Sequence, residues 1–156
     1  MDRNLAPVRG ENVGMTQQIE TINNMEKALD FLREHKDVAF ATCDGDLPKV
    51  RVFQIMKQEG TRLWFATSAK KEVYKELQRN PNVELLAWAD KVSVRCVGKV
   101  EFAVTDGDKK WIYDNNPVLP RLYDRYDKLD YFRMDINAMD YYDLSPTPPE
   151  IKHFDL

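Results

Sequence analysis

The sequence predicts an α+β fold: a single closed antiparallel β-barrel of about six strands, with one central helix and small flanking helices. Short apolar or alternating runs, separated by turn residues, recur from residue 38 to residue 104. One helical pattern, over residues 69–79, interrupts these runs. Gly98 lies inside the longest alternating run, where a glycine favours the bulge or bend that closes a small barrel.

Length and composition predict one ordinary globular domain. The chain has 156 residues, of which 43% are hydrophobic and 31% charged, and its net charge is −3. A slightly negative chain has no general field for nucleic acid or anionic membranes. No apolar run reaches the roughly 18 residues of a membrane span, and the N-terminus lacks an apolar signal core. We therefore expect a cytoplasmic protein that binds neither nucleic acid nor membrane.

The cysteines and histidines favour neither metal binding nor nucleophilic catalysis. Cys43 and Cys96 fall in strand-like runs, which predicts buried free thiols. His35 and His153 lie far from each other and from both cysteines, so no metal-binding spacing exists. No serine or cysteine motif stands near a histidine, which leaves a catalytic triad without its base.

The elements are expected in the following order. Residues 1–23 form an extension that is flexible or docks on a partner subunit, and residues 24–156 form the single domain. Asn24 caps a helix that ends near Lys36. The expected strands cover residues 38–43, 49–57, 62–67, 83–89 and 92–104, and the first three form an antiparallel meander. Short helices over 106–113 and 118–126, strands over 129–136 and 141–144, and a docking tail over 150–156 complete the chain.

The turn from Thr67 to Lys71 is the first candidate site. Ser68 is a good N-cap residue for the helix that follows, which places Lys70 and Lys71 in its first turn. The helix dipole is positive there, so acidic residues are expected instead. A bound anion, held by free N–H groups, both hydroxyls and the lysines, would explain the pattern. The alternative, two solvated surface lysines, stays open.

Arg51 and the tryptophans are the second set of candidates. Arg51 alternates with Phe53 and Ile55 on one face of its strand, where a cation needs a partner. It either occupies an edge position, forms a cross-strand ion pair or contacts a ligand. The ligand contact would lie near Thr67, since the second and third strands are predicted hairpin partners. The tryptophans are expected in the core or at an interface, and their number suits a planar aromatic ligand at a subunit boundary: Trp64, Trp88 and Trp111.

The order of these segments resembles a known family. The stretch 38–54 follows a helix, the stretch 63–85 contains the turn and an Asn-Pro-Asn-Val segment, and an Arg-x-x-Gly element spans Arg95–Gly98. Together they resemble the FMN-binding split-barrel family typified by pyridoxamine 5'-phosphate oxidase, over residues 24–144. The closest likeness is to its short, nitroimidazole-reductase-like branch. The chain departs from the oxidase itself at residues 121–125 and at the C-terminus, so pyridoxal phosphate synthesis is not expected.

The resemblance implies a six-stranded split barrel with a central crossover helix, working as a homodimer with FMN at its interface. The ribityl phosphate would meet Arg51, Thr67, Ser68 and Lys71, with Lys70 as a second candidate. The isoalloxazine edge would lie along Val52, Phe53, Gln54, Phe65 and Ala66. The partner chain would add an aromatic residue, for which Trp88 and Trp111 are the candidates.

The implied activity is that of an FMN-dependent oxidoreductase, a flavin reductase or nitroreductase-like enzyme. NADH or NADPH would supply a hydride to FMN, which would pass two electrons to a small acceptor such as a quinone or nitroaromatic compound. No dedicated acid or base is needed for this. A non-catalytic flavin-binding module for redox sensing or stress response is the alternative. A haem-binding relative is a third, with only His35 and His153 as iron ligands.

Overall fold

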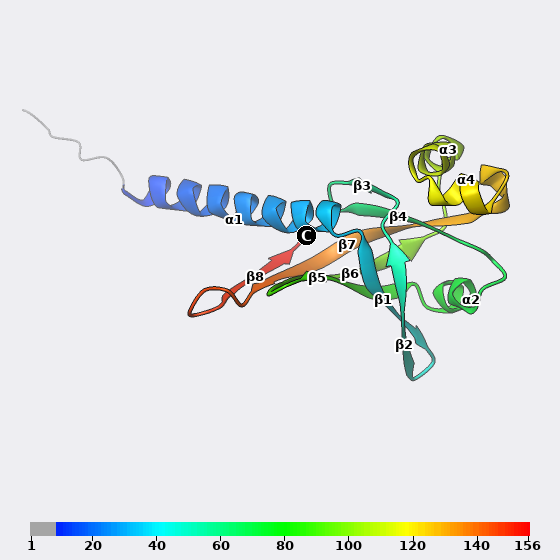
Figure 1. The fold of residues 1–156 in the computed structure, drawn as a ribbon. Coiled ribbons are helices and arrows are strands. Elements are labelled where there is room, and N and C mark those ends of the chain that lie inside the picture. The colour runs from blue at the N-terminus through cyan, green and yellow to red at the C-terminus, as the bar shows by residue number, and fades with distance from the viewer. Residues whose placement is uncertain (1–8) are drawn as a thin grey trace, which may run out of the picture.

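The computed structural model describes residues 9–156, with side chains from residue 13 on. One antiparallel sheet forms the body of this part, with helices at its periphery (Figure 1). Its eight strands are β1 (Asp37–Asp44), β2 (Leu47–Gln54), β3 (Lys57–Glu59), β4 (Arg62–Thr67), β5 (Asn82–Ala89), β6 (Val92–Glu101), β7 (Asp130–Asp143) and β8 (Glu150–Asp155). The helices are α1 (Arg9–Glu34), α2 (Glu72–Arg79), α3 (Asp106–Asn115), α4 (Val118–Leu122) and the 3₁₀-helix η1 (Tyr126–Lys128).

The fold is α+β in class, but its sheet is not a closed barrel. Its strand order is β2-β1-β5-β6-β7-β4-β3, with β8 added beside β7, and the end strands β2 and β3 do not pair with each other. The predicted closure is therefore wrong. The chain leaves β2 after Gln54, passes through Ile55 and Met56, and starts the separate strand β3. The predicted second strand thus splits in two, which is one reason for eight strands where about six were expected.

The core is filled by aromatic side chains from both ends of the strand order. The ring centroids of Phe53 on β2 and Phe65 on β4 lie 5.9 Å apart, and both rings contact Phe132 on β7. Phe40 on β1 completes the cluster, at 5.1 Å from Phe53. Contacts of this kind bring roughly 0.5–1.5 kcal/mol beyond the buried area. Side-chain packing therefore joins β2 to β4, although no backbone pairing connects these two strands.

Gly98 occupies an irregularity of the sheet, as the sequence predicts. The pairing of β6 with β7 shifts register between Val97 and Gly98. A Cβ atom on Gly98 would overlap the backbone oxygen of Asp135. The glycine is therefore required by the close approach of the neighbouring strand.

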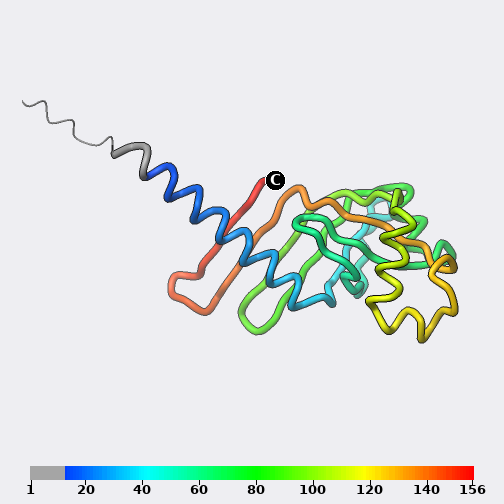
Figure 2. Tube along the Cα trace, turned by 90° about the horizontal axis from the view of Figure 1, so that it is seen from above, coloured from blue at the N-terminus to red at the C-terminus, as the bar shows by residue number. Residues whose placement is uncertain are grey.

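Helix α1 begins far earlier than predicted. It is continuous from Arg9, so the expected start at Asn24 is wrong, and the expected end near Lys36 is close to Glu34. Gly10 and Gly14 each cost about 1 kcal/mol of helix propensity, which weakens the helix without ending it. Its second half buries Leu29 and Leu32, whereas its first half extends past the sheet (Figure 2). The first eight residues of the predicted extension lie outside the described part.

Tertiary pairing also changes the C-terminal elements. The two strands expected over 129–136 and 141–144 form one strand, β7, and the expected docking tail becomes β8. Phe154 of β8 is buried, as a docking residue should be, whereas Ile151 is exposed. Thr105 caps α3 by accepting a hydrogen bond from the backbone N–H of Asp108. Among the described residues, no helix is long and apolar enough to cross a membrane.

Candidate functional site

A free strand edge lies near each end of the strand order in the described sheet. Strand β2 pairs only with β1. On β4, residues 65–67 pair only with β7, because β3 reaches no further than Trp64. We call the region between residues 52–54 and residues 65–67 the split. Its edges carry backbone N–H and C=O groups outside the ladders of the described sheet, which can bind a ligand. The contact of the Phe53 and Phe65 rings shows that the two edges lie close together.

The turn predicted to bind phosphate lies at the end of the β4 edge. Thr67 is only 3% exposed, and its Oγ1 atom is buried with no hydrogen-bond partner in the described part of the chain. Such an unsatisfied hydroxyl costs about 1–3 kcal/mol. Ser68 is half-buried, whereas Lys70 and Lys71 are exposed. The turn therefore combines one unsatisfied buried hydroxyl with two accessible cations.

The lysines do not lie in the first turn of a helix. Helix α2 begins at Glu72, and Lys71 is its N-cap in an extended conformation. Before it, the Ser68 carbonyl accepts a hydrogen bond from the Lys71 N–H at 3.0 Å, and the Asp130 carboxylate accepts one from the Ala69 N–H at 2.6 Å. These bonds hold residues 68–71 as a turn. The lysines therefore precede the first turn in which they were predicted to lie, and both are exposed, as the alternative proposed.

Arg51 lies on the end strand β2, which agrees with the predicted edge position, but its ion pair is with helix α2 and not across strands. Its strand is the hairpin partner of β1, so the predicted pairing with the Thr67 strand is wrong. The guanidinium lies 2.9 Å from a carboxylate oxygen of Glu76 on α2, and it donates a hydrogen bond to the Thr42 hydroxyl at 3.0 Å. Arg51 is thus held between the sheet and α2.

Glu76 is a buried charge that sequence reasoning missed. Its side chain is 1% exposed and accepts a hydrogen bond from the Thr42 hydroxyl at 2.6 Å. Burial raises the pKa of Glu76, but the Thr42 bond and the Arg51 charge outweigh it and lower the pKa below its usual range. A signal was present in the sequence, because Glu76 shares the helical face of Val73, three residues earlier.

The predicted ring-binding residues differ in what they can offer. The Phe65 side chain is fully buried in the core, so only its backbone can contact a ligand, and Ala66 is half-buried. Phe53 is partly buried against the core, whereas Val52 is 71% exposed. Gln54 donates to the Asp37 carboxylate at 3.2 Å. The split therefore presents mainly backbone groups.

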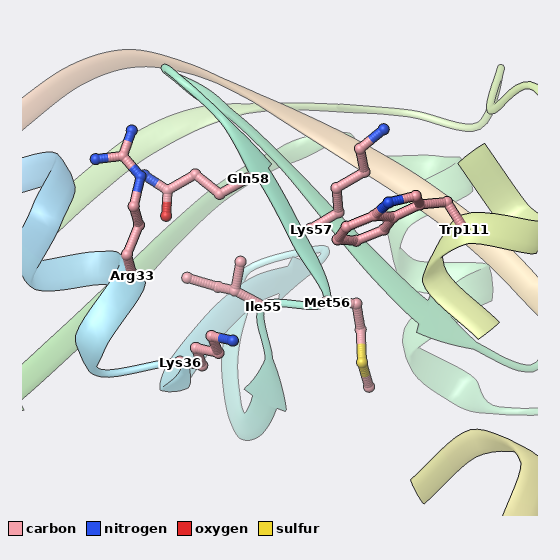
Figure 3. Close-up of a pocket in the computed structure, with 7 residues that line it drawn as sticks. All are labelled: Arg33, Lys36, Ile55, Met56, Lys57, Gln58 and Trp111. Atoms are coloured by element: carbon pink, nitrogen blue, oxygen red, sulfur yellow. The ribbon is translucent and has the colours of Figure 1, made fainter. Parts of the chain in front are cut away.

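The three tryptophans occupy different places. Trp64 is buried in a small cluster with residues of α3 and α4, whereas Trp88 and Trp111 are about half exposed. Trp111 lies on α3 at the edge of a cavity of about 240 Å³ (Figure 3). The other residues that line this cavity are Arg33, Lys36, Ile55, Met56, Lys57 and Gln58. Sequence reasoning named only Trp111, because the lining comes from three segments far apart in the chain.

Trp88 belongs to the outer face of the sheet, which we define by the outward residues of β2, β1, β5, β6, β7 and β8. Register places the following residues in one row across these strands: Val52, Ala39, Leu86, Arg95, Asp140 and His153. Arg95 pairs with Asp140 at 2.6 Å. Large apolar side chains are exposed around this pair: Val50, Val52, Leu86, Trp88, Tyr142 and Ile151. This apolar face resembles an uncovered interface.

The described residues give no sign of metal or thiol chemistry. None of their histidine, cysteine, aspartate and glutamate side chains form a group of three or more that could hold a metal ion. Cys43 is exposed, so the prediction that both thiols are buried is wrong for this residue. Cys96 is buried, and burial raises the pKa of its thiol to about 12, which makes it a poor nucleophile.

Comparison with known structures shows the same fold in several bacterial proteins. A NimC/NimA family protein from Clostridium acetobutylicum is 26% identical, with a TM-score of 0.68 over 85% of this chain and 92% of that one. A protein from the same organism, related to general stress protein 26 of Bacillus subtilis, is 16% identical, with a TM-score of 0.70 over 85% and 94%. A heme-binding protein from Mycobacterium smegmatis is 12% identical, with a TM-score of 0.69 over 84% and 57%.

Sequence comparison identifies the family. No curated protein sequence matches the chain. The family model described as pyridoxamine 5'-phosphate oxidase matches residues 25–138, which include every strand from β1 to β6, the split and most of β7. This protein therefore belongs to the pyridoxamine 5'-phosphate oxidase family.

Proposed function

We propose that the protein is a cytoplasmic homodimer that binds FMN in the split and acts as an FMN-dependent oxidoreductase of the flavin reductase or nitroreductase-like type. The observation that carries the proposal is the buried Thr67 hydroxyl at the end of the split, which has no hydrogen-bond partner among the described residues. Natural structures rarely leave such a group unsatisfied unless a ligand or water completes it. Family membership makes a flavin phosphate the first candidate.

The turn supplies the groups that suit a phosphate. The hydroxyls of Thr67 and Ser68 can donate hydrogen bonds, and Lys71 and Lys70 add positive charge. Arg51 can add positive charge while Glu76 and Thr42 hold its guanidinium. Asp130 opposes the phosphate, because its carboxylate already accepts the Ala69 N–H. Side chains would therefore contribute more to phosphate binding than a helix N-terminus.

The free strand edges suit the polar rim of a flavin ring. Residues 52–54 and residues 65–66 offer backbone donors and acceptors from opposite ends of the sheet. Val52 is exposed on the outer face, where a second copy of the chain can cover a bound ring and add Trp88. When bound, FMN supplies the redox chemistry, accepting a hydride from NADH or NADPH and passing two electrons to a small acceptor. The chain's own residues bind, orient and shield the ring.

A non-catalytic flavin-binding module for redox sensing or stress response is the alternative. The structural similarity to a protein related to general stress protein 26 favours it. In the described residues, the split contains no histidine or cysteine that could act as an acid or base. The haem alternative has less support, because His153 lies on the outer face and His35 packs against Phe31 of α1.

Flavin binding is tested by comparing FMN with riboflavin, which lacks the phosphate. The purified protein should be yellow and release FMN on denaturation. Lys71→Ala should weaken FMN binding by about tenfold or more, because a charge-assisted bond is worth about 1.5–3 kcal/mol, and should leave riboflavin binding unchanged. Lys75→Ala is the matched control, since Lys75 is exposed on α2 and pairs with Glu72. If Lys71→Ala weakened FMN and riboflavin binding equally, Lys71 would not contact the phosphate, and the phosphate would bind elsewhere.

Thr67→Val tests directly whether the buried Thr67 hydroxyl binds FMN. The valine has nearly the same shape but no hydroxyl, so the protein without FMN should be as stable as wild type or more so, while its FMN affinity falls. A variant that binds FMN normally would contradict the proposed site. Consumption of NADH or NADPH with an artificial acceptor then separates the two functions. No turnover by flavin-loaded protein would leave only the binding module.

A further inference from the structure

The cavity beside Trp111 is separate from the split in its lining residues. It lies between the end of α1, the link from β2 to β3, and α3, and none of its lining residues belongs to residues 52–54 or 65–71. Its volume of about 240 Å³ is below the roughly 300–1,000 Å³ of typical ligand pockets. A single aromatic ring with small substituents suits a cavity of this size, whereas a dinucleotide does not.

Lys57 orders the aromatic side of the cavity. Its ammonium lies 2.6 Å from the Asp108 carboxylate and 2.9 Å from that of Glu59. The same ammonium stands over the rings of Trp64 and Trp111, at 5.0 and 5.2 Å from their centroids. Its charge is thus already balanced, and its role is to hold the Trp111 indole in place.

Arg33 and Lys36 give the opposite side a positive charge. Figure 3 shows Arg33, Gln58 and Lys36 on one side of the cavity and Trp111 with Lys57 on the other. Arg33 pairs with Asp30 in an exposed pair one helical turn away, which is worth little and leaves further donors. Lys36 has no carboxylate partner among the described residues. An anionic group is therefore favoured on this side.

The rest of the cavity lining consists of two apolar side chains and one side-chain amide. Ile55 is 3% exposed and Met56 is half-buried, so a ring can lie against both. The Gln58 amide is fixed by donating to the Leu29 carbonyl at 3.1 Å, while its oxygen is buried without a donor in the described part of the chain. An unsatisfied acceptor favours a ligand with a hydroxyl or N–H group.

We propose that this cavity is a second small-molecule site, which binds an aromatic carboxylate with its ring against Trp111 and its carboxylate toward Arg33 and Lys36. The indole face supplies stacking, and the two cations supply charge-assisted hydrogen bonds. The site does not require FMN, so it stands independently of the proposed function.

The matched ligands 4-hydroxybenzoate and phenol test the proposal, because they differ only in the carboxylate. Calorimetric titration of the wild-type protein should give at least about tenfold tighter binding of 4-hydroxybenzoate. The double variant Arg33→Gln with Lys36→Gln should lose this preference, and Trp111→Ala should weaken both ligands. Leu122→Ala, which removes another exposed apolar side chain, should change neither. Equal affinity for the two ligands in wild type would overturn the proposal.

Competition with FMN gives a second outcome. Saturating FMN should not displace 4-hydroxybenzoate, since the cavity and the split share no residue. Displacement would mean that the cavity holds one end of the flavin and would overturn the separate site. A protein that binds 4-hydroxybenzoate but no FMN would refute the proposed function alone. Loss of FMN binding in Thr67→Val with unchanged 4-hydroxybenzoate binding would support both sites.

Discussion

At the scale of single residues, the Glu76 carboxylate has the largest structural effect near the split. It joins α2 to both strands of the first hairpin, through Thr42 on β1 and Arg51 on β2. A buried ion pair contributes little net stability compared with a hydrophobic pair, but loss of one partner leaves the other uncompensated. Arg51 therefore cannot be treated as a surface contact for phosphate alone, and Arg51→Ala should reduce stability as well as FMN affinity.

Glu76→Gln should lower the free energy of unfolding by about 2 kcal/mol at pH 7, since Arg51 is partly exposed and part of the cost is relieved by solvent. The folded-state pKa of Glu76 lies below its ordinary value of 4.5. Its stabilising effect is therefore complete above pH 4.5 and is lost as the pH falls through the folded-state pKa. Urea denaturation at several pH values should show the wild-type advantage shrinking below pH 4.5.

Glu72→Gln is the control for that experiment, because Glu72 lies on the same helix with its side chain 71% exposed. Its effect should stay within about 0.5 kcal/mol. An advantage of wild type over Glu76→Gln that is independent of pH would show that the carboxylate charge is not what stabilises α2.

At the scale of elements, the irregularity in β6 determines how closely β7 approaches. The register shift at Gly98 brings the Asp135 backbone against the position where any side chain would begin. β7 continues past this point as a strand of 14 residues that pairs with β6, β4 and β8. Gly98 therefore allows β7 to pair with three neighbouring strands.

Gly98→Ala should destabilise the fold by about 2 kcal/mol or more, because the added methyl group would overlap the Asp135 carbonyl. Gly107→Ala is the matched control: it lies in α3 with open space around its Cβ position, and it should stabilise by roughly 0.5–1 kcal/mol through helix propensity. Thermal and urea midpoints measure both changes. A neutral Gly98→Ala variant would show that the two strands can separate without cost.

At the scale of the whole molecule, the outer face is the surface that a single chain leaves uncovered. Leu86, Trp88, Tyr142 and Ile151 are exposed around the Arg95–Asp140 pair. A contiguous apolar face of this kind usually marks an interface. A second copy is the expected occupant, because a homodimer at this face would also enclose the edge of β2 at the split.

Trp88→Glu should therefore convert a dimer into a monomer at micromolar concentration, since a charge would be buried without a partner. Light scattering coupled to gel filtration measures this. Leu122→Glu is the control, because Leu122 is 63% exposed on α4, away from the outer face. A wild-type monomer, or a Trp88→Glu dimer, would show that the interface lies elsewhere.

The family and the class of fold were predictable from the sequence because they depend on local signals. Turn residues, alternation and the spacing around residues 63–85 are properties of short segments, and the structure keeps them. The bulge at Gly98 and the inward position of Arg51 also follow from period-two alternation.

Only the tertiary structure decided where those segments meet. Pairing between distant strands left the sheet open, joined two predicted strands into β7 and used the tail as β8. Asp130, sixty-one positions away, holds Ala69 and so delays the start of α2 until Glu72. Glu76 on α2 forms an ion pair with Arg51 on β2, and three distant segments form the Trp111 cavity. Local propensity cannot specify contacts of this kind, because their free energy depends on groups that the sequence separates and the fold brings together.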